Sequence, residues 1–203
     1  MSASPEAPAD YPPFAIGARF RLVPPGTETT GDRIDLIMAR GAFGSGEHET
    51  TASCLEILET RPEVAGARVL DLGSGTGILA IAAHKLGATS ALCVDIAPEA
   101  VHSARQNCSL NSITTNISHR CGTLSVVPET GFDLVLANIY GDILLDIAPD
   151  LVDRARPGAL LLLSGMLWEY NFDVRQRYAA LGCTLIKNRF LDEFSTLLLQ
   201  KQL

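Results

Sequence analysis

The chain has 203 residues, of which 47% are hydrophobic, and a formal net charge of -7. This length suits one domain with a sizeable core, and no apolar run of about 18 residues is present to cross a membrane. The acidic balance argues against a surface that follows nucleic-acid phosphates, since such surfaces need clustered Lys and Arg. The first residues have neither the basic nor the apolar region of a secretory leader, so we expect a cytoplasmic protein.

The cysteines point away from disulfide and metal chemistry. The five cysteines lie far apart and form no C-x-x-C pair, so neither a disulfide framework nor a zinc site is indicated. We expect reduced and mostly buried thiols, and no bound metal, at Cys54, Cys93, Cys108, Cys121 and Cys183.

The chain opens with short segments. Residues 1–16 contain four prolines and too little apolar surface to offset chain entropy, so we expect a flexible tail before one domain over residues 17–203. The next elements are two short strands, a glycine-containing loop and a helix, which we expect at 18–23, 33–38, 41–49 and 50–59.

From residue 68 onward, strands alternate with helices. We expect strands at 68–72, 91–95, 117–121, 132–137 and 159–163, helices at 78–86, from Pro98, across 144–154 and at 172–181, and a last antiparallel hairpin at 184–189 and 195–201. The run 159–163 is apolar on both faces, as in a central parallel strand. This pattern predicts an α/β fold with a doubly wound, seven-stranded, mostly parallel sheet that binds ligands at the carboxyl ends of its strands.

The most informative segment, residues 69–78, reads V-L-D-L-G-S-G-T-G-I. An apolar strand runs into three glycines at alternate positions, and glycine can adopt positive φ and let a ligand lie against the backbone. The dinucleotide fingerprint is G-x-G-x-x-G, which binds a pyrophosphate at a helix N-terminus. Here Ile78 occupies the position of the third glycine, so a ligand without a pyrophosphate is favoured.

Asp95 narrows the choice of ligand. It follows Gly73 by 22 positions, at the end of the apolar run 91–94, where a carboxylate can accept both hydroxyls of a ribose. Adenosine without a diphosphate points to S-adenosylmethionine (SAM). The alternative is an ordinary strand-turn-helix with a surface aspartate.

Asn138 follows the strand at 132–137 and so opens onto the same edge of the sheet. Its amide oxygen can hold an amine N–H and aim the nitrogen lone pair at an electrophilic methyl, which fits transfer to nitrogen. Alternatively, Asn138 caps the helix that starts near Gly141. Trp168 and Tyr170 either line the acceptor pocket or pack as core or lid.

The loop at 41–49 carries further candidates. His48 between Glu47 and Glu49 suggests an acid-base pair or a cation-binding lip, although successive residues point different ways and a half-solvated triplet is the alternative. Phe43 can cover a bound cofactor or pack against the N-terminal strands. The two threonines that follow are expected at a helix N-terminus, whose free N–H groups favour an anionic partner.

Four motifs together resemble the PrmA family, the methyltransferases of large-subunit ribosomal protein eleven, and related protein-lysine methyltransferases. Residues 42–51 resemble A-F-G-T-G-x-H-x-T-T, 71–83 resemble D-x-G-x-G-[ST]-G-I-L-A-I-A-A, 137–139 resemble A-N-I, and 163–167 resemble L-S-G-I-L. The resemblance implies a class I, Rossmann-like SAM-dependent methyltransferase with a catalytic Asn138. With the glycine loop, the expected cofactor contacts are Phe43, Thr51, Asp71, Gly73, Gly75, Gly77, Asp95 and Asn138.

We therefore expect a SAM-dependent N-methyltransferase that acts on a lysine or amino-terminal nitrogen of a basic protein, without direct nucleic-acid or membrane binding. The alternatives are a small-molecule N-methyltransferase, a catalytically silent SAM-binding module and a nicotinamide oxidoreductase, which Ile78 disfavours. Two features depart from the family. The residues before the loop do not resemble its N-terminal recognition domain, and Glu47 and Glu49 add negative charge near the expected crevice. The resemblance therefore supports the class of activity more strongly than it supports the identity of the substrate.

Overall fold

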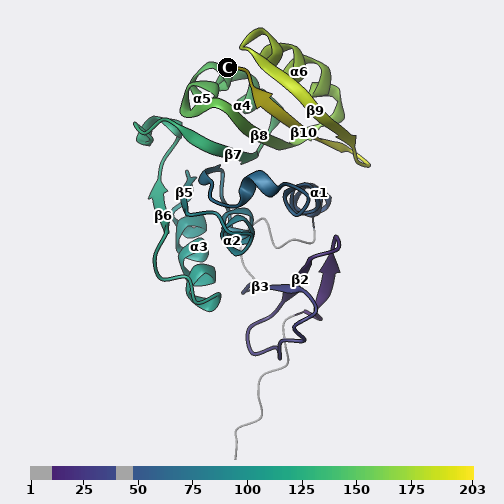
Figure 1. Cartoon of the computed structure of the whole chain (residues 1–203), viewed down its shortest axis with the longest axis vertical. Coiled ribbons are helices and arrows are strands. Elements are labelled where there is room, and N and C mark those ends of the chain that lie inside the picture. The colour runs from purple at the N-terminus through teal and green to yellow at the C-terminus, as the bar shows by residue number, and fades with distance from the viewer. Residues whose placement is uncertain (1–10, 40–47) are drawn as a thin grey trace, which may run out of the picture.

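The structure is a computed structural model that describes residues 11–39 and 48–203 (Figure 1). Phe43 and Glu47 therefore lie outside the described residues. Within the described ranges, the strands form a small sheet of three and a large sheet of seven. No helix among these residues combines the length and the apolar character that a bilayer crossing requires.

The N-terminal segment forms the small sheet. Its strands are β1 (Phe14–Ile16), β2 (Phe20–Val23) and β3 (Ile34–Ile37), with β1 antiparallel and β3 parallel to β2. Tyr11 is buried, and its hydroxyl donates to the Met38 carbonyl at 2.6 Å. The expected flexible tail is therefore wrong for residues 11–16, because Tyr11 and Ile16 bury apolar surface that holds this segment on the domain.

The large sheet has the strand order β6-β5-β4-β7-β8-β10-β9 and is parallel except for β10, which is antiparallel to both neighbours. Its strands are β4 (Arg68–Leu72), β5 (Ser90–Asp95), β6 (Ile117–Cys121), β7 (Phe132–Asn138), β8 (Ala155–Leu167), β9 (Cys183–Phe190) and β10 (Phe194–Lys201). The expected fold class and the C-terminal antiparallel hairpin are thus confirmed. The strand order reverses at β4, which lies between β5 and β7, and doubly wound sheets bind their ligands at such a switch point.

Helices cover both faces of the large sheet (Figure 1). One face carries α1 (Glu49–Leu58), α2 (Ile78–Lys85) and α3 (Pro98–Leu110), and the other carries α4 (Gly141–Asp146), α5 (Ala148–Arg154) and α6 (Asn171–Ala180). Short 3-10 turns occur at Pro62–Val64, Leu124–Val126 and Trp168–Tyr170.

Alternating side chains of the central strands supply two separate cores. On β4, Val69 packs with residues of α1 and α2, whereas Leu70 packs with residues of α4, α5 and α6. On β7, Leu134 and Val135 divide between the two cores in the same way. Because both faces of these strands are buried, their sequences are continuous apolar runs rather than alternating ones.

The helix expected across residues 144–154 is two helices, α4 and α5, that meet at Ile147. Pro149 lies in the first turn of α5, where it lacks an N–H for helical bonding and disfavours helical backbone at the preceding residue. The chain then enters β8, which begins at Ala155 rather than at the expected residue 159.

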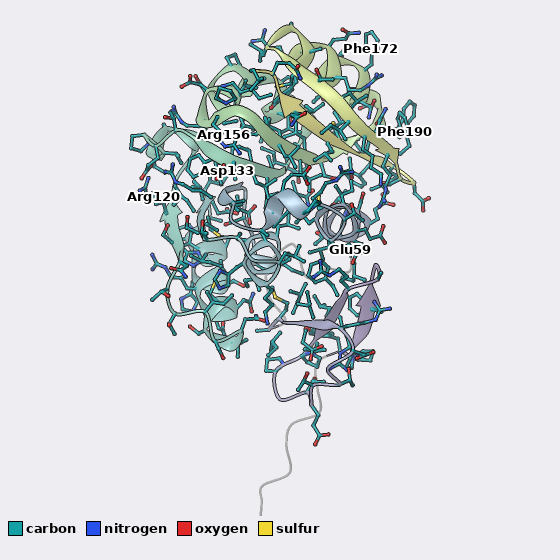
Figure 2. All side chains as sticks on the ribbon, in the orientation of Figure 1. Glu59, Arg120, Asp133, Arg156, Phe172 and Phe190 are labelled. Atoms are coloured by element: carbon teal, nitrogen blue, oxygen red, sulfur yellow. The ribbon has the colours of Figure 1, made fainter. Side chains whose placement is uncertain are left out.

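A carboxylate at the end of α1 holds the turn between β1 and β2. The two oxygens of Glu59, labelled in Figure 2, accept the N–H groups of Ala18 and Arg19 at 2.8 and 2.7 Å. Gly17 in this turn has φ +59°, and a Cβ there would lie 2.5 Å from a Glu59 oxygen. The positive φ favours glycine at this position, and a Cβ there would displace the Glu59 carboxylate that holds the turn.

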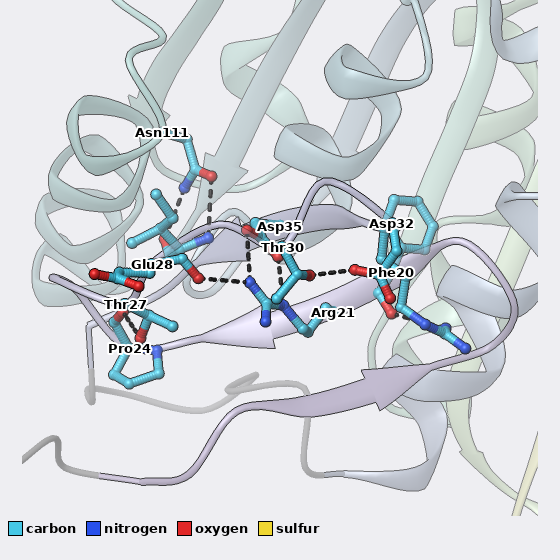
Figure 3. Close-up of polar contacts among 11 residues, drawn as sticks. Phe20, Arg21, Pro24, Thr27, Glu28, Thr30, Asp32, Asp35 and Asn111 are labelled. Carbon is cyan, nitrogen blue, oxygen red and sulfur yellow. Dashed lines mark hydrogen bonds and ion pairs between the residues drawn. The ribbon is translucent and has the colours of Figure 1, made fainter.

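Two buried asparagines, one in α3 and one at its C-cap, attach the small sheet to the rest of the domain. The Asn111 amide accepts from Ile37 N at 3.0 Å and donates to Ile37 O at 2.7 Å (Figure 3). One turn earlier, Asn107 accepts from Ala39 N and donates to Thr76 O, each at 3.0 Å. Asn107 thus links the segment after β3 directly to the glycine loop after β4.

We predict that Asn111→Ala lowers the free energy of unfolding by about 1–3 kcal/mol, since the Ile37 N–H and C=O both lose their side-chain partner. Urea denaturation measures this difference. Gln106→Ala, at an exposed position of the same helix, is the matched control and should change stability by less than about 0.5 kcal/mol. Equal losses in the two variants would contradict the role of Asn111.

Candidate functional site

The glycine loop lies at the carboxyl edge of the large sheet, between β4 and α2. Gly73, Gly75 and Gly77 have φ values of 69°, 51° and 77°, so all three adopt the left-handed conformation that favours glycine. The Gly73 N–H donates to Val94 O at 2.8 Å. A Cβ on Gly73 would lie 2.3 Å from the Cγ2 of Ile139, so only glycine allows this turn to sit against the end of β7.

Asp95 ends β5 beside the glycine loop. One carboxylate oxygen accepts from Gly75 N at 2.8 Å and the other accepts from Ala97 N at 3.0 Å. An ionised carboxylate offers about four lone-pair positions, so these two bonds leave acceptor capacity on each oxygen. The two backbone bonds fix the direction of the carboxylate, which can still receive two further hydroxyl donors.

Ile96 directly follows Asp95, and 71% of its surface is exposed. An aliphatic side chain that is this exposed, next to a hydrogen-bonding carboxylate, offers an apolar surface on which a flat ring can pack. Ile96 is not among the site residues expected from the sequence. The signal that could have found it is its place in the turn between a strand end and Pro98, outside the apolar run 91–94.

Asp71 lies underneath the glycine loop rather than on its surface. Its side chain is buried, and one oxygen accepts from Ala80 N in the first turn of α2 at 3.2 Å. Burial raises the pKa of this carboxyl to about 7, the Ala80 hydrogen bond opposes the rise, and the nearby Asp95 charge adds to it. Asp71 therefore braces α2 against β4.

Asn138 is the last residue of β7. Its Nδ2 donates to Thr51 Oγ1 at 3.4 Å, whereas its Oδ1 is buried and has no hydrogen-bond partner among the described residues. Gly165 on the neighbouring strand has φ +78°, and a Cβ there would lie 2.8 Å from this Oδ1. The helix cap that the sequence left open as an alternative is not observed, because Tyr140 is the N-cap of α4. A buried acceptor without a partner is costly and calls for a ligand donor.

The His48 region serves mainly to position α1. His48 is the N-cap of α1: its Nδ1 accepts from Thr50 N at 3.4 Å, and its ring meets Phe194 edge-on at 5.0 Å between centroids. Glu49 turns away to the β9–β10 hairpin, where its oxygens accept from Asp192 N at 3.2 Å and Glu193 N at 3.5 Å. For His48 and Glu49, the two described residues of the triplet, this geometry fits the half-solvated alternative better than an acid-base pair.

Tyr170 and Trp168, the residues expected to line an acceptor pocket or to pack as core or lid, differ in their surroundings. Tyr170 packs against Gly141, where a Cβ would lie 2.5 Å from the tyrosine ring, whereas Trp168 is exposed. The structure brings together the glycine loop, Asp95, Asn138 and Thr51, keeps Asp71 beneath them, and leaves Phe43 outside the described residues. Within the described residues, no group of three or more His, Cys, Asp or Glu is arranged to hold a metal ion.

Comparison with known proteins gives one consistent result. The family described as ribosomal protein L11 methyltransferase (PrmA) matches residues 5–202. The ribosomal protein L11 methyltransferases of Pelobacter propionicus and Trichlorobacter lovleyi are 41% and 42% identical over 178 residues, which cover 84% of this chain and 57% and 58% of those proteins. The chain thus spans less than two thirds of the length of these curated relatives.

A solved structure agrees over the whole fold. The crystal structure of ribosomal protein L11 methylase from Lactobacillus delbrueckii subsp. bulgaricus superposes with a TM-score of 0.86 at 29% sequence identity, covering 95% of this chain and 100% of that chain. The likeness therefore includes the small sheet as well as the large one.

The buried Asp71 predicts an unusual pH dependence of stability. Since its folded-state pKa is raised to about 7 from an ordinary value near 3.9, the folded state holds this proton more tightly than the unfolded state. The free energy of unfolding should therefore fall by up to about 4 kcal/mol as the pH rises from 4 to 7, and then stay level. In Asp71→Asn, which keeps an acceptor for Ala80 N, this decline should disappear. Urea unfolding at several pH values tests it, and equal slopes in the two proteins would contradict it.

Proposed function

The chain belongs to the ribosomal protein L11 methyltransferase (PrmA) family, and on that premise we propose that it transfers a methyl group from SAM to an amine nitrogen of a protein. The observation that carries the proposal is the buried Asn138 Oδ1, which has no hydrogen-bond partner in residues 11–39 and 48–203 and lies at the edge where the glycine loop and Asp95 meet. This oxygen can accept a hydrogen bond from the N–H of an amine during methyl transfer.

The residues around the glycine loop fit SAM. Three left-handed glycines let a ligand approach the backbone, Asp95 retains acceptor capacity for two ribose hydroxyls, and Ile96 offers an apolar face for the adenine. SAM supplies an electrophilic methyl on a sulfonium. Thr51, buried at the N-terminal turn of α1, lies beside Asn138, where the positive end of the helix dipole favours the carboxylate end of the cofactor.

The protein's part in the chemistry is to align and to desolvate the acceptor amine. Asn138 Oδ1 would accept one amine N–H and so direct the nitrogen lone pair. Thr51 Oγ1 accepts from Asn138 Nδ2 and thereby holds the amide in the orientation that presents its oxygen. A lysine with a pKa near 10.4 is only about one part in a thousand neutral at pH 7.4, and removal from water lowers that pKa.

The charge of the chain supports a basic protein as the methyl acceptor. The named relatives methylate ribosomal protein L11 by their descriptions, and a net charge of -7 suits a basic, lysine-bearing protein better than a nucleic acid. We place the protein in the cytoplasm, which suits its five free cysteines. Labelled SAM incubated with L11 and with fractionated extract tests the proposal, and label on a small metabolite alone would favour the small-molecule alternative.

Asp95→Ala should weaken SAM binding at least tenfold, since the loss of hydrogen bonds to a charged acceptor is worth about 1.5–3 kcal/mol each. Calorimetry with SAM and with its demethylated product measures the affinity, and thermal unfolding checks that the loop survives the loss of the Gly75 and Ala97 bonds. Unchanged affinity, or tight binding of NAD by the wild-type chain, would overturn the assignment of the cofactor.

Asn138→Ala should lower kcat by on the order of a hundredfold and weaken SAM binding only modestly, because orientation of the amine acts mainly in the transition state. Steady-state kinetics with saturating SAM gives kcat, and calorimetry on the same preparation supplies the control for cofactor binding. A variant with full activity would leave Asn138 with a structural role only.

A further inference from the structure

Three segments adjoin at the carboxyl edge of the sheet around Asn138: residues 139–143, 167–173 and 191–193, here named the acidic aromatic rim. Ile139 N donates to Ser164 O at 2.9 Å, which joins the first segment to the end of β8. Gly141 lacks a side chain and so allows Tyr170 to pack on it. The Trp168 N–H donates to Glu193 O at 2.9 Å, which joins the second segment to the third.

The rim exposes large aromatic side chains that a folded domain normally buries. Tyr140 is 69% exposed, Trp168 is 60% exposed and Phe172, seen at the outer edge of the molecule in Figure 2, is 59% exposed. Aromatic faces attract cations, most strongly for tryptophan and tyrosine. The Arg175 guanidinium already lies 5.8 Å from the centre of the Phe172 ring, which leaves Tyr140 and Trp168 as the faces open to an external cation.

The three segments of the rim carry only acidic charge, and Arg175, which lies over Phe172, is a cation at their border. The segments contain no Lys, Arg or His, and their five carboxylates are exposed: Asp142, Glu169, Asp173, Asp192 and Glu193. Among the described residues, none of these carboxylates forms an ion pair. Glu49 adds a further carboxylate at the base of the third segment. The surface therefore offers unneutralised negative charge next to open aromatic faces.

The rim is continuous with the reacting position. Two of its segments leave directly from β7 and β8, whose ends hold Asn138 and Gly165, and Gly165 lies against the unpartnered Asn138 oxygen. A chain lying over the rim would thus lie next to the strand ends that carry this amide. This arrangement complements a lysine side chain, which has an apolar stem and a cationic end.

We propose that the acidic aromatic rim is the surface on which the protein substrate docks, and that its occupant is a basic segment carrying the lysine to be methylated. The inference rests on the function proposed above and adds the surface and its chemistry. Glu169 and Asp173 attract the basic flanks of the segment, while Tyr140 and Trp168 contact lysine stems. Encounter is steered by charge and weakens with salt, since the screening length is about 8 Å at physiological ionic strength.

Direct binding can be followed without turnover, because Trp168 is the single tryptophan of the chain. In a titration with decalysine, Trp168 fluorescence should change in a saturable way that added salt weakens, whereas decaglutamate should leave the emission unchanged. Glu169→Gln/Asp173→Asn should weaken decalysine binding at least about threefold, the effect of losing two exposed charge pairs.

The control variant removes the same number of charges elsewhere. Glu63→Gln/Asp150→Asn again replaces one glutamate and one aspartate, both exposed and, like Asp173, in the first turn of a helix. It should bind decalysine like the wild-type chain. Equal weakening in both double variants, or no response of Trp168 to decalysine, would overturn the docking proposal.

Methylation of purified L11 separates this inference from the proposed function. If the function holds, the rim variant should show a raised KM for L11 and a shallower salt dependence, with kcat and the affinity for SAM unchanged. A wild-type chain that methylates no protein would overturn the proposed function, whereas active rim and control variants with identical KM and salt dependence would overturn only the rim.

Discussion

The candidate site depends on how closely the turns after β4 and β7 approach each other. Gly73 and Ile139 are packed so tightly that a single added carbon at Gly73 would overlap the isoleucine. This approach brings the glycine loop to the same place as Asn138, although the two motifs lie far apart in the chain. Gly165 acts in the same way from the other side, because it lets β8 run against the Asn138 amide. Glycine thus controls distances between strands as well as local turns.

Hydrogen bonds from two buried asparagines extend this arrangement to the small sheet. Asn107 connects Ala39 N with Thr76 O, so the segment that leaves β3 and the glycine loop share one side chain. Asn111 makes a paired contact with Ile37 one turn later. Because buried amides must satisfy both donor and acceptor, these bonds define the position of the small sheet on α3 closely. The small sheet is therefore part of the scaffold that positions the glycine loop.

Charge at the carboxyl edge is divided between buried and exposed carboxylates with different tasks. Asp71 is buried beneath the loop, and burial raises its pKa to about 7, so it carries little charge at lower pH. Asp95 has its direction fixed by two backbone N–H groups and keeps acceptor capacity for a ligand. The carboxylates of the acidic aromatic rim are exposed and act only over short distances through solvent. Burial thus decides whether a carboxylate in this region stabilises the fold, binds a ligand or attracts a charged partner.

Features that depend on neighbouring residues could be predicted from the amino-acid sequence. Apolar runs and turn residues located the strands, the glycine spacing and Asp95 indicated the ligand class, and the order of elements predicted the sheet. Features that depend on contacts between distant parts of the chain were predicted wrongly or not at all. Tyr11 holds on the domain a segment that was expected to be a tail, and the exposed position of Ile96 beside Asp95 was not predicted. The unpartnered Asn138 oxygen and the clustering of the rim came only from the tertiary structure, because both result from strand order, which joins segments that no local spacing relates.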